Sequence, residues 1–134
     1  MPDRILYLAP EFDEWAAKEL ATAKRDRSRD LHPYEQVEQL FRDFVVGSPM
    51  AYSVHCRKLQ PLNRHTWELK TEDVRVLGWF PRRTIFIAVG GDLKKNLRDW
   101  DAYTPHIENV VDFRTNLDLD EPKWITGVTI SEVL

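Results

Sequence analysis

Two stretches in the first third of the chain place apolar residues at the three- and four-residue spacing of an amphipathic helix. The first follows Pro10 and is expected to reach about Ala23; its apolar positions are Phe12, Trp15, Ala16 and Leu20. The second begins near Pro33 and gives the strongest helical pattern; its apolar positions are Tyr34, Val37, Leu40, Phe41, Phe44 and Val45. Between them lies a charged segment, residues 24–30, so the pattern predicts a helical hairpin with one apolar face.

Four short segments have the β-branched and aromatic composition of strands. The first is Ile5–Leu8, and the other three are residues 66–70, 74–80 and 84–89. Only the polar segments 71–73 and 81–83 separate the last three, and connections this short imply antiparallel neighbours. The sequence therefore predicts an α+β domain in which the N-terminal helical hairpin packs on a small antiparallel sheet.

A C-terminal helix is expected after the sheet. Thr104 and Pro105 are residue types preferred at a helix N-cap and in the first turn. The residues expected to face inward are Ile107, Val110, Val111 and Leu117. The tail, residues 118–134, has two interpretations: an added strand over residues 125–130, or a frayed end.

Composition limits the class of protein. The 134 residues suffice for one hydrophobic core, so we treat 1–134 as a single domain with its core over about 5–117 and an extension over 118–134. The single cysteine, Cys56, excludes an intrachain disulfide and a cysteine-based zinc site. No segment approaches the roughly 20 apolar residues of a membrane span. These features predict a cytoplasmic protein without a metal or a cofactor.

Charge is unevenly distributed along the chain. The formal net charge is −3, which by itself argues against a nucleic-acid partner. Residues 53–95, however, contain nine Lys and Arg against four Asp and Glu, a balance of +5, so the remainder carries −8. Positive charge therefore coincides with the predicted sheet.

Several short motifs follow one another in a fixed order along this framework. They include Trp67-Glu68-Leu69 and Arg75-Val76-Leu77 in the sheet and Leu93-Lys94-Lys95 after its last strand. In their order and spacing, over roughly residues 5–117, the chain resembles the RelE/HigB-like toxins of bacterial toxin–antitoxin systems, especially the phage-derived HigB-like branch. The resemblance implies a RelE-like fold and a metal-independent endoribonuclease that cleaves mRNA, usually on the ribosome, until a cognate antitoxin protein neutralises it.

By the same resemblance, cleavage is attack of a ribose 2′-hydroxyl on the adjacent phosphate, which requires a base, an acid and positive charge near the phosphorane. Arg75 matches the family's strand arginine, and its guanidinium suits bidentate phosphate contact. Lys94 and Lys95 are expected beside it on a loop. The alternative is an exposed Arg75 paired with Glu68 or Glu72. Because truncating exposed charges changes stability little, we expect Arg75→Ala to abolish toxicity without unfolding the chain.

Two histidines are candidates for proton transfer. His65 precedes the first meander strand and would act as a base if it faced the cleft; a turn histidine without function is the alternative. His106, close to Tyr103, would replace the histidine and tyrosine that many relatives place after the last strand. Candidates for contacts with the RNA backbone are Arg57, Lys58, Arg64, Arg82 and Arg83.

Departures from the family pattern keep other functions open. Residues 90–96 lack the aromatic or histidine of many active relatives, and the net charge is acidic. A catalytically silent RelE-like module that binds an antitoxin, a host factor or DNA is therefore the alternative function, and an unrelated α+β ligand-binding domain ranks last. Exposure of Trp79 or Phe80 beside a basic cleft would favour RNA, and burial of both would favour core packing. Trp100 and Trp124 are candidates for a partner-binding patch.

Overall fold

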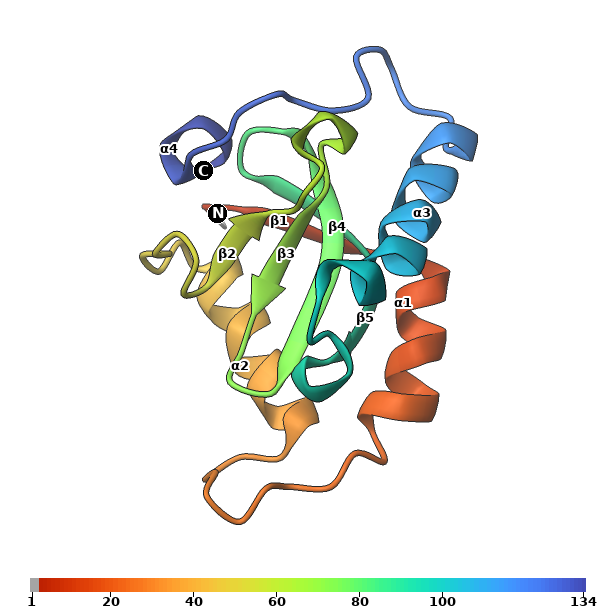
Figure 1. Cartoon of the computed structure of the whole chain (residues 1–134). Helices are drawn as coiled ribbons and strands as arrows, with labels where there is room; N and C mark the ends of the chain where they lie inside the picture. The colour runs from red at the N-terminus through yellow and green to blue at the C-terminus, as the bar shows by residue number, and fades with distance from the viewer. Residues whose placement is uncertain (1–2) are drawn as a thin grey trace.

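Residues 3–134, which the computed structural model describes, form a five-stranded mixed sheet with helices on both faces (Figure 1). The strands are β1 (Ile5–Leu8), β2 (Cys56–Lys58), β3 (Trp67–Lys70), β4 (Val74–Arg82) and β5 (Ile85–Leu93). The helices are α1 (Pro10–Trp15), α2 (Pro33–Val45), α3 (Trp100–Asn116) and α4 (Ile130–Val133). This arrangement confirms the predicted α+β class. No helix within the described part of the chain has the length and apolar character required to cross a bilayer.

The order of strands across the sheet is β1-β5-β4-β3-β2, and β1 pairs in parallel with β5. The prediction of an antiparallel sheet is correct for the meander β2–β5 and wrong for β1. Two helices and the meander separate β1 from β5 in the chain, so no tight turn forces these two strands to run in opposite directions. The sequence analysis also missed β2, whose three residues are too few to show a periodic pattern.

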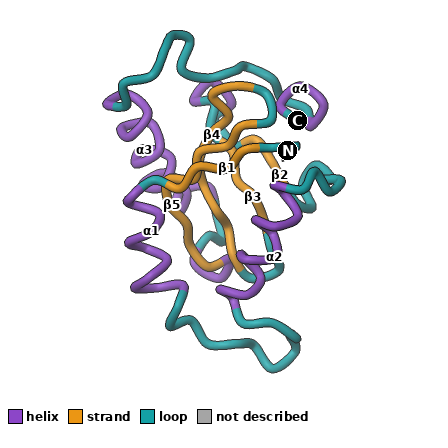
Figure 2. The backbone as a smooth tube through the Cα atoms, turned by 180° about the vertical axis from the view of Figure 1, so that it is seen from behind, coloured by secondary structure: helices purple, strands orange, loops and turns teal. Residues whose placement is uncertain are grey.

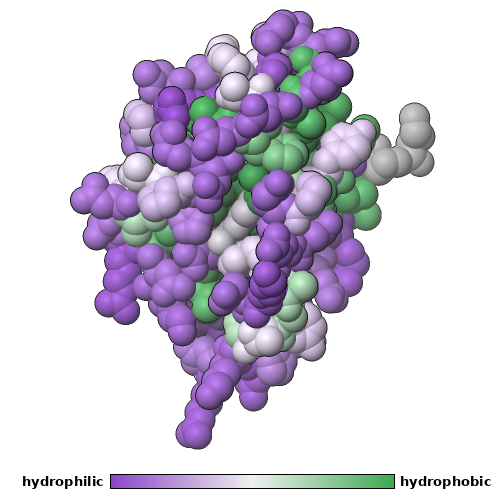
Figure 3. Space-filling view, turned by 90° about the vertical axis from the view of Figure 1, so that its right-hand side faces the viewer, coloured by the Kyte–Doolittle hydropathy of each residue, from purple (hydrophilic) through white to green (hydrophobic). Residues whose placement is uncertain are grey.

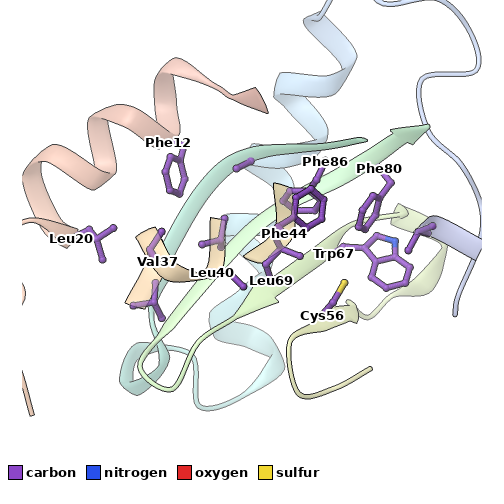
Figure 4. Packing of buried hydrophobic residues seen from close by; sticks show 14 residues of the cluster. Phe12, Leu20, Val37, Leu40, Phe44, Cys56, Trp67, Leu69, Phe80 and Phe86 are labelled. Carbon is purple, nitrogen blue, oxygen red and sulfur yellow. The ribbon is translucent and has the colours of Figure 1, made fainter. Parts of the chain in front are cut away.

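Two layers of apolar side chains cover the sheet, because successive strand residues point to opposite faces. On one face, Val76 and Phe86 lie beneath α1 and α2. Figure 4 shows the side chains of these helices and of the strands directed into the space between them. On the other face, Leu77 and Val89 pack against Ile107 and the rest of α3. The helical hairpin therefore covers only one face, and α3 covers the other.

Trp79 and Phe80 are adjacent in β4 and lie in different layers of the core. Both side chains are fully buried. The ring of Phe80 makes edge contacts with Trp67 and Phe86, with centroids 5.3 and 5.0 Å apart. Of the two roles considered for Trp79 and Phe80, burial favours core packing over base stacking.

Helix α3 begins earlier than its sequence pattern predicts. Asp99 is the N-cap, and its carboxylate accepts a hydrogen bond of 2.9 Å from the Ala102 backbone N–H. The predicted start at Thr104 and Pro105 is wrong, because Asp99 supplies an equally good cap and the helix accommodates Pro105 in its interior. Ile107 and Val110 are buried as expected.

The tail is neither an added strand nor a frayed end. It crosses one end of the sheet and finishes in α4 beside the start of β1 (Figures 1 and 2). The indole N–H of Trp79 donates to the Lys123 carbonyl at 2.7 Å, and the Thr84 N–H donates to the Val133 carbonyl at 2.7 Å. Val133 is completely buried in the layer beneath α1 and α2. The extension is thus part of the core.

Two glycines of the β4–β5 hairpin provide a matched test of this packing. A Cβ added at Gly78 would lie 1.8 Å from the Ile87 carbonyl oxygen, whereas one added at Gly90 meets no described atom within 4 Å. We expect Gly78→Ala to lower the free energy of unfolding by about 3 kcal/mol, because backbone must move in a close-packed core. Gly90→Ala should change it by less than about 1 kcal/mol. Urea denaturation of both variants measures this difference, and equal stability of the two would contradict the close approach.

Candidate functional site

Four basic side chains from separate elements lie close to one another, and two of them pair with a buried carboxylate. They are Arg57, Lys70, Arg75 and Lys94, which we call the basic cluster. The sheet register aligns Arg57 with Glu68 and Lys70 with Arg75, so these strand residues project from the same face. Lys94 follows β5, and its N–H donates to the Asp73 carbonyl at 2.7 Å. The structure therefore brings together three sequence-predicted residues, Arg57, Arg75 and Lys94.

Glu68 lies between Arg57 and Arg75 of the basic cluster and is 0% exposed. Its Oε1 is 3.0 Å from Arg57 Nη2 and 3.7 Å from Arg75 Nε. Neither carboxylate oxygen has a well-aligned hydrogen-bond donor within residues 3–134. A buried carboxylate without such donors depends on the nearby cations for its charge compensation.

Arg75 is buried, with only 7% of its surface exposed. Its Nη1 donates to the carbonyls of Thr71 at 2.7 Å and Val74 at 3.1 Å, which fixes the guanidinium over the sheet. The pairing with Glu68 is present, whereas Glu72 pairs with Arg29 at 2.9 Å. The expectation of an exposed Arg75 is wrong, because β4 is the central strand of the sheet and lies under α3.

A cavity of about 640 Å³ opens beside the basic cluster, lined in part by Arg29, Lys70, Arg75 and Lys94. Burial, and after it the charge of Arg75, lowers the pKa of Lys70; Arg57 and Lys94 act in the same direction. Neighbouring cations that lower one another's pKa repel each other, and an anion bound between them removes this repulsion. Asp30, Asp43 and Glu72 also line the cavity. An anion would therefore bind most favourably on the side of the cavity lined by Lys70, Arg75 and Lys94.

His55, which the sequence analysis did not name as a candidate, also lines this cavity. Its Nδ1 accepts a hydrogen bond of 2.9 Å from the Ala51 backbone N–H. In the neutral imidazole this bond assigns the proton to Nε2, which is then a donor. His55 is therefore placed to donate a hydrogen bond to an anion, but it cannot accept a proton at Nε2 while the Ala51 bond persists. Its position immediately before the basic strand β2 was the available sequence signal.

Tyr103 reaches the basic cluster from α3, and Arg57 Nη2 lies 3.4 Å from its hydroxyl. Burial, followed by the neighbouring Glu68 carboxylate, raises the pKa of Tyr103 to about 12. The hydroxyl consequently keeps its proton at neutral pH. Tyr103 accepts a hydrogen bond from Arg57 here and is not a base.

His65 lies outside the basic cluster. Its Nδ1 is 3.1 Å from Lys58 Nζ, and its ring stacks on Trp124 with centroids 5.6 Å apart. Burial, and after it the charges of Lys58 and Arg114, lowers the pKa of His65, so the ring is neutral at pH 7. The structure thus separates His65 from Arg75 and Lys94.

His106 and Lys95 also face other surroundings. His106 Nε2 is 3.0 Å from Asp92 Oδ2 and lines a second cavity, of about 690 Å³, between α1 and α3 over Gly90. The surface on the side of α1 and α3 is mostly hydrophilic (Figure 3). Lys95 lines a smaller cavity with Lys24. The predicted pair of adjacent lysines is therefore divided, and only Lys94 lies near Arg75.

Most of the other predicted RNA contacts hold the C-terminal extension. Lys58 Nζ donates to the carbonyls of Thr126 at 3.2 Å and Gly127 at 3.1 Å. Arg82 donates to the Asp120 and Pro122 carbonyls, and Arg83 donates to that of Leu134. Arg64 forms an ion pair of 2.6 Å with Glu108 on α3. These contacts give Lys58, Arg64, Arg82 and Arg83 structural roles, and RNA contact by them stays a prediction.

Arg114 is a buried cation that the sequence analysis did not single out. It donates to the carbonyls of Arg64 at 2.8 Å and His65 at 3.1 Å, and its guanidinium lies 4.6 Å from the Trp124 ring centroid. Trp124 is consequently enclosed between His65 and Arg114. The position of Arg114 in a helix gave no sequence signal that it supports the loop before β3, because the contact depends on how α3 packs against residues 64 and 65.

Comparisons with known proteins yield no relative of this chain. No protein-family model matches it, and neither the curated proteins nor the solved structures give a match. Within residues 3–134, no group of three or more His, Cys, Asp or Glu side chains is arranged to hold a metal ion. What the site can do must therefore be inferred from its own residues.

Removing Arg75 tests the charge balance at Glu68. We expect Arg75→Ala to lower the free energy of unfolding by about 3 kcal/mol, because a buried carboxylate loses one of its two nearby cations. Lys94→Ala, which removes an exposed cation of the same cluster, should cost less than about 0.5 kcal/mol. Chemical denaturation followed by circular dichroism measures both values. Wild-type stability in Arg75→Ala would show that Glu68 does not depend on this pair.

The lowered pKa of His65 predicts a specific pH dependence. As the pH falls below about 6.5, the unfolded chain binds a proton at this histidine before the folded protein does, so stability decreases towards the lower folded pKa. His65→Gln removes this component. We expect the free energy of unfolding of the variant to decrease less than that of the wild type between about pH 7.5 and 5.5. If urea titrations gave the same change in the free energy of unfolding with pH for the wild type and for His65→Gln, His65 would make no contribution to the pH dependence of stability.

Proposed function

We propose that this chain is the toxin of a type II toxin–antitoxin system, acting in the cytoplasm as a metal-independent endoribonuclease on mRNA, in contact with the ribosome. A cognate antitoxin protein would neutralise it. The observation that carries the proposal is the convergence of Lys70, Arg75 and Lys94 with His55 on one cavity. The α+β class and the antiparallel meander are compatible with the RelE/HigB-like resemblance, and the RelE-like fold itself is part of this proposal.

The basic cluster suits phosphoryl chemistry that proceeds without a metal. The bond from the ribose 2′-oxygen to phosphorus forms while the bond to the 5′-oxygen breaks, which yields a 2′,3′-cyclic phosphate and a 5′-hydroxyl. Negative charge accumulates on the non-bridging oxygens, where Lys70, Arg75 and Lys94 supply preorganised positive charge. The Nε2–H of His55 adds a further hydrogen-bond donor to the same cavity. Electrostatic stabilisation is thus the principal contribution of this site.

A catalytically silent binding module is the second candidate, and the state of the proton-transfer groups favours it. His55 Nδ1 is occupied by the Ala51 N–H, and Tyr103 retains its proton because its pKa is about 12. His65 and His106 face other surroundings. A protein with this arrangement would bind an RNA backbone through the basic cluster without cleaving it.

Substitutions of two lysines test the proposed role of the cluster. The induced wild-type protein is expected to arrest growth. We expect the Lys70→Gln/Lys94→Gln variant to cause no growth arrest and to cleave mRNA at least about 100-fold less than the wild type. The matched control Lys24→Gln/Lys95→Gln removes the same charge from a different cavity and should remain toxic. Growth curves and primer extension on mRNA from the same cultures provide the measurement.

The outcomes separate the two candidates. New mRNA ends that depend on translation and disappear only in Lys70→Gln/Lys94→Gln support the endoribonuclease. Two results together support the silent module. The mRNA stays intact with the wild type, and the protein binds RNA with a slope of log Kd against log salt concentration that is lower by about 1.4 in Lys70→Gln/Lys94→Gln than in the wild type. Equal effects of the two double variants would exclude the basic cluster as the functional site.

A further inference from the structure

Two exposed aromatic rings flank a groove along β2, which is an edge strand of the sheet. Tyr52 is 45% exposed and Trp100 is 46% exposed. The groove has a volume of about 770 Å³ and is bounded on its other side by residues 128–131 of the C-terminal extension. Exposed aromatic rings on both sides of one groove are costly to leave in water and indicate a binding surface.

The charge of this groove differs from that of the whole chain. Arg57 and Lys58 line it, and its other described lining residues are uncharged. The full sequence, by contrast, contains 22 acidic and 19 basic residues. A groove lined by basic and not by acidic residues favours an anionic over a cationic occupant.

Each ring is supported from behind by a buried aromatic residue. Tyr52 makes an edge contact with Trp67, with centroids 6.2 Å apart, and Trp100 packs against Tyr103 at 5.4 Å. The guanidinium carbon of Arg57 lies 5.1 Å from the Trp100 ring centroid. The same Arg57 contacts Glu68, which also pairs with Arg75 of the basic cluster. Arg57 therefore connects the aromatic groove to the proposed phosphate site.

We propose that this groove is a stacking site for the bases of a single-stranded RNA, whose backbone continues into the basic cluster. The proposal rests on the proposed function and extends it, because it names the path of the substrate on the protein. Unpaired bases stack on exposed aromatic side chains with little dependence on their identity, while cations hold the phosphates. In a duplex the bases are already stacked on one another, so the groove distinguishes single strands from duplexes.

A peptide strand added to the edge of β2 is the competing occupant of such a groove. The Ser53 N–H already donates to the outward carbonyl of Cys56 at 2.8 Å, so β2 offers an incomplete edge for strand addition. An uncharged peptide backbone also makes no use of the partly exposed Arg57 guanidinium that lies beside Trp100. Both observations favour RNA.

Binding of a labelled single-stranded RNA of about eight nucleotides, measured by fluorescence anisotropy, tests the stacking site. We expect Trp100→Ala and Tyr52→Ala each to weaken binding about tenfold, and Trp100→Phe to stay within about threefold of the wild type. Tyr7→Ala is the matched control, because Tyr7 is 56% exposed on β1 at the opposite edge of the sheet. It should bind as the wild type does. Circular dichroism checks that every variant is folded.

An oligonucleotide of the same length without bases makes the test specific for stacking. The wild type should bind it about 100-fold more weakly than the intact strand, and the Tyr52→Ala/Trp100→Ala variant should bind both strands alike. Unchanged RNA affinity in both aromatic variants would overturn the stacking site and leave the groove to a peptide. Loss of binding only in Lys70→Gln/Lys94→Gln would uphold the proposed function but not this inference. Loss only in the aromatic variants would uphold the stacking site and refute both the continuation of the backbone into the basic cluster and the proposed function of that cluster.

Discussion

The structure around the candidate site depends on one buried carboxylate. Glu68 has no exposed surface, and ion pairing with Arg57 and Arg75 is its charge compensation among the described residues. An ionised group in the core is tolerated only where opposite charge is held close to it. Glu68 on β3 thereby holds one cation on β2, Arg57, and another on β4, Arg75. The other basic residues of the cluster lie next to these two.

Because Glu68 must be paired, Arg75 and Arg57 each have a structural role in addition to their proposed role in binding. Arg75 is anchored by Glu68 and by backbone carbonyls, yet it also lines the cavity in which an anion would bind. Arg57 pairs with Glu68 and extends under Trp100 towards the groove along β2. Side chains held in this way lose little freedom when a ligand binds, so preorganisation for a phosphate is obtained from the fold itself. The residue most suited to phosphate contact is for this reason also one of the least replaceable.

Positive charge elsewhere in the sequence serves the fold. Lys58, Arg82 and Arg83 donate to backbone carbonyls of the C-terminal extension, and Arg114 supports the loop before β3. Carbonyl groups of an irregular segment need donors when the sheet does not supply them. Local basic charge in the sequence therefore had two causes. Within residues 3–134, the second cause is the cluster around Glu68, where unsatisfied polar atoms lie next to residues that line an open cavity.

The sequence by itself determined the elements with strong periodicity, namely the two N-terminal helices and the strands β3, β4 and β5, because apolar spacing reflects which side of an element is buried. It also indicated Arg75, Lys94 and Arg57. It did not determine the start of α3, where Asp99 and Thr104 are both adequate caps and long-range packing decides between them. Only the tertiary structure decided that Lys94 and not Lys95 joins Arg75, that His55 enters the site in place of His65, and that β1 runs parallel to β5. These outcomes depend on residues distant in the chain, whose register and side-chain direction are set when the sheet and its two layers assemble.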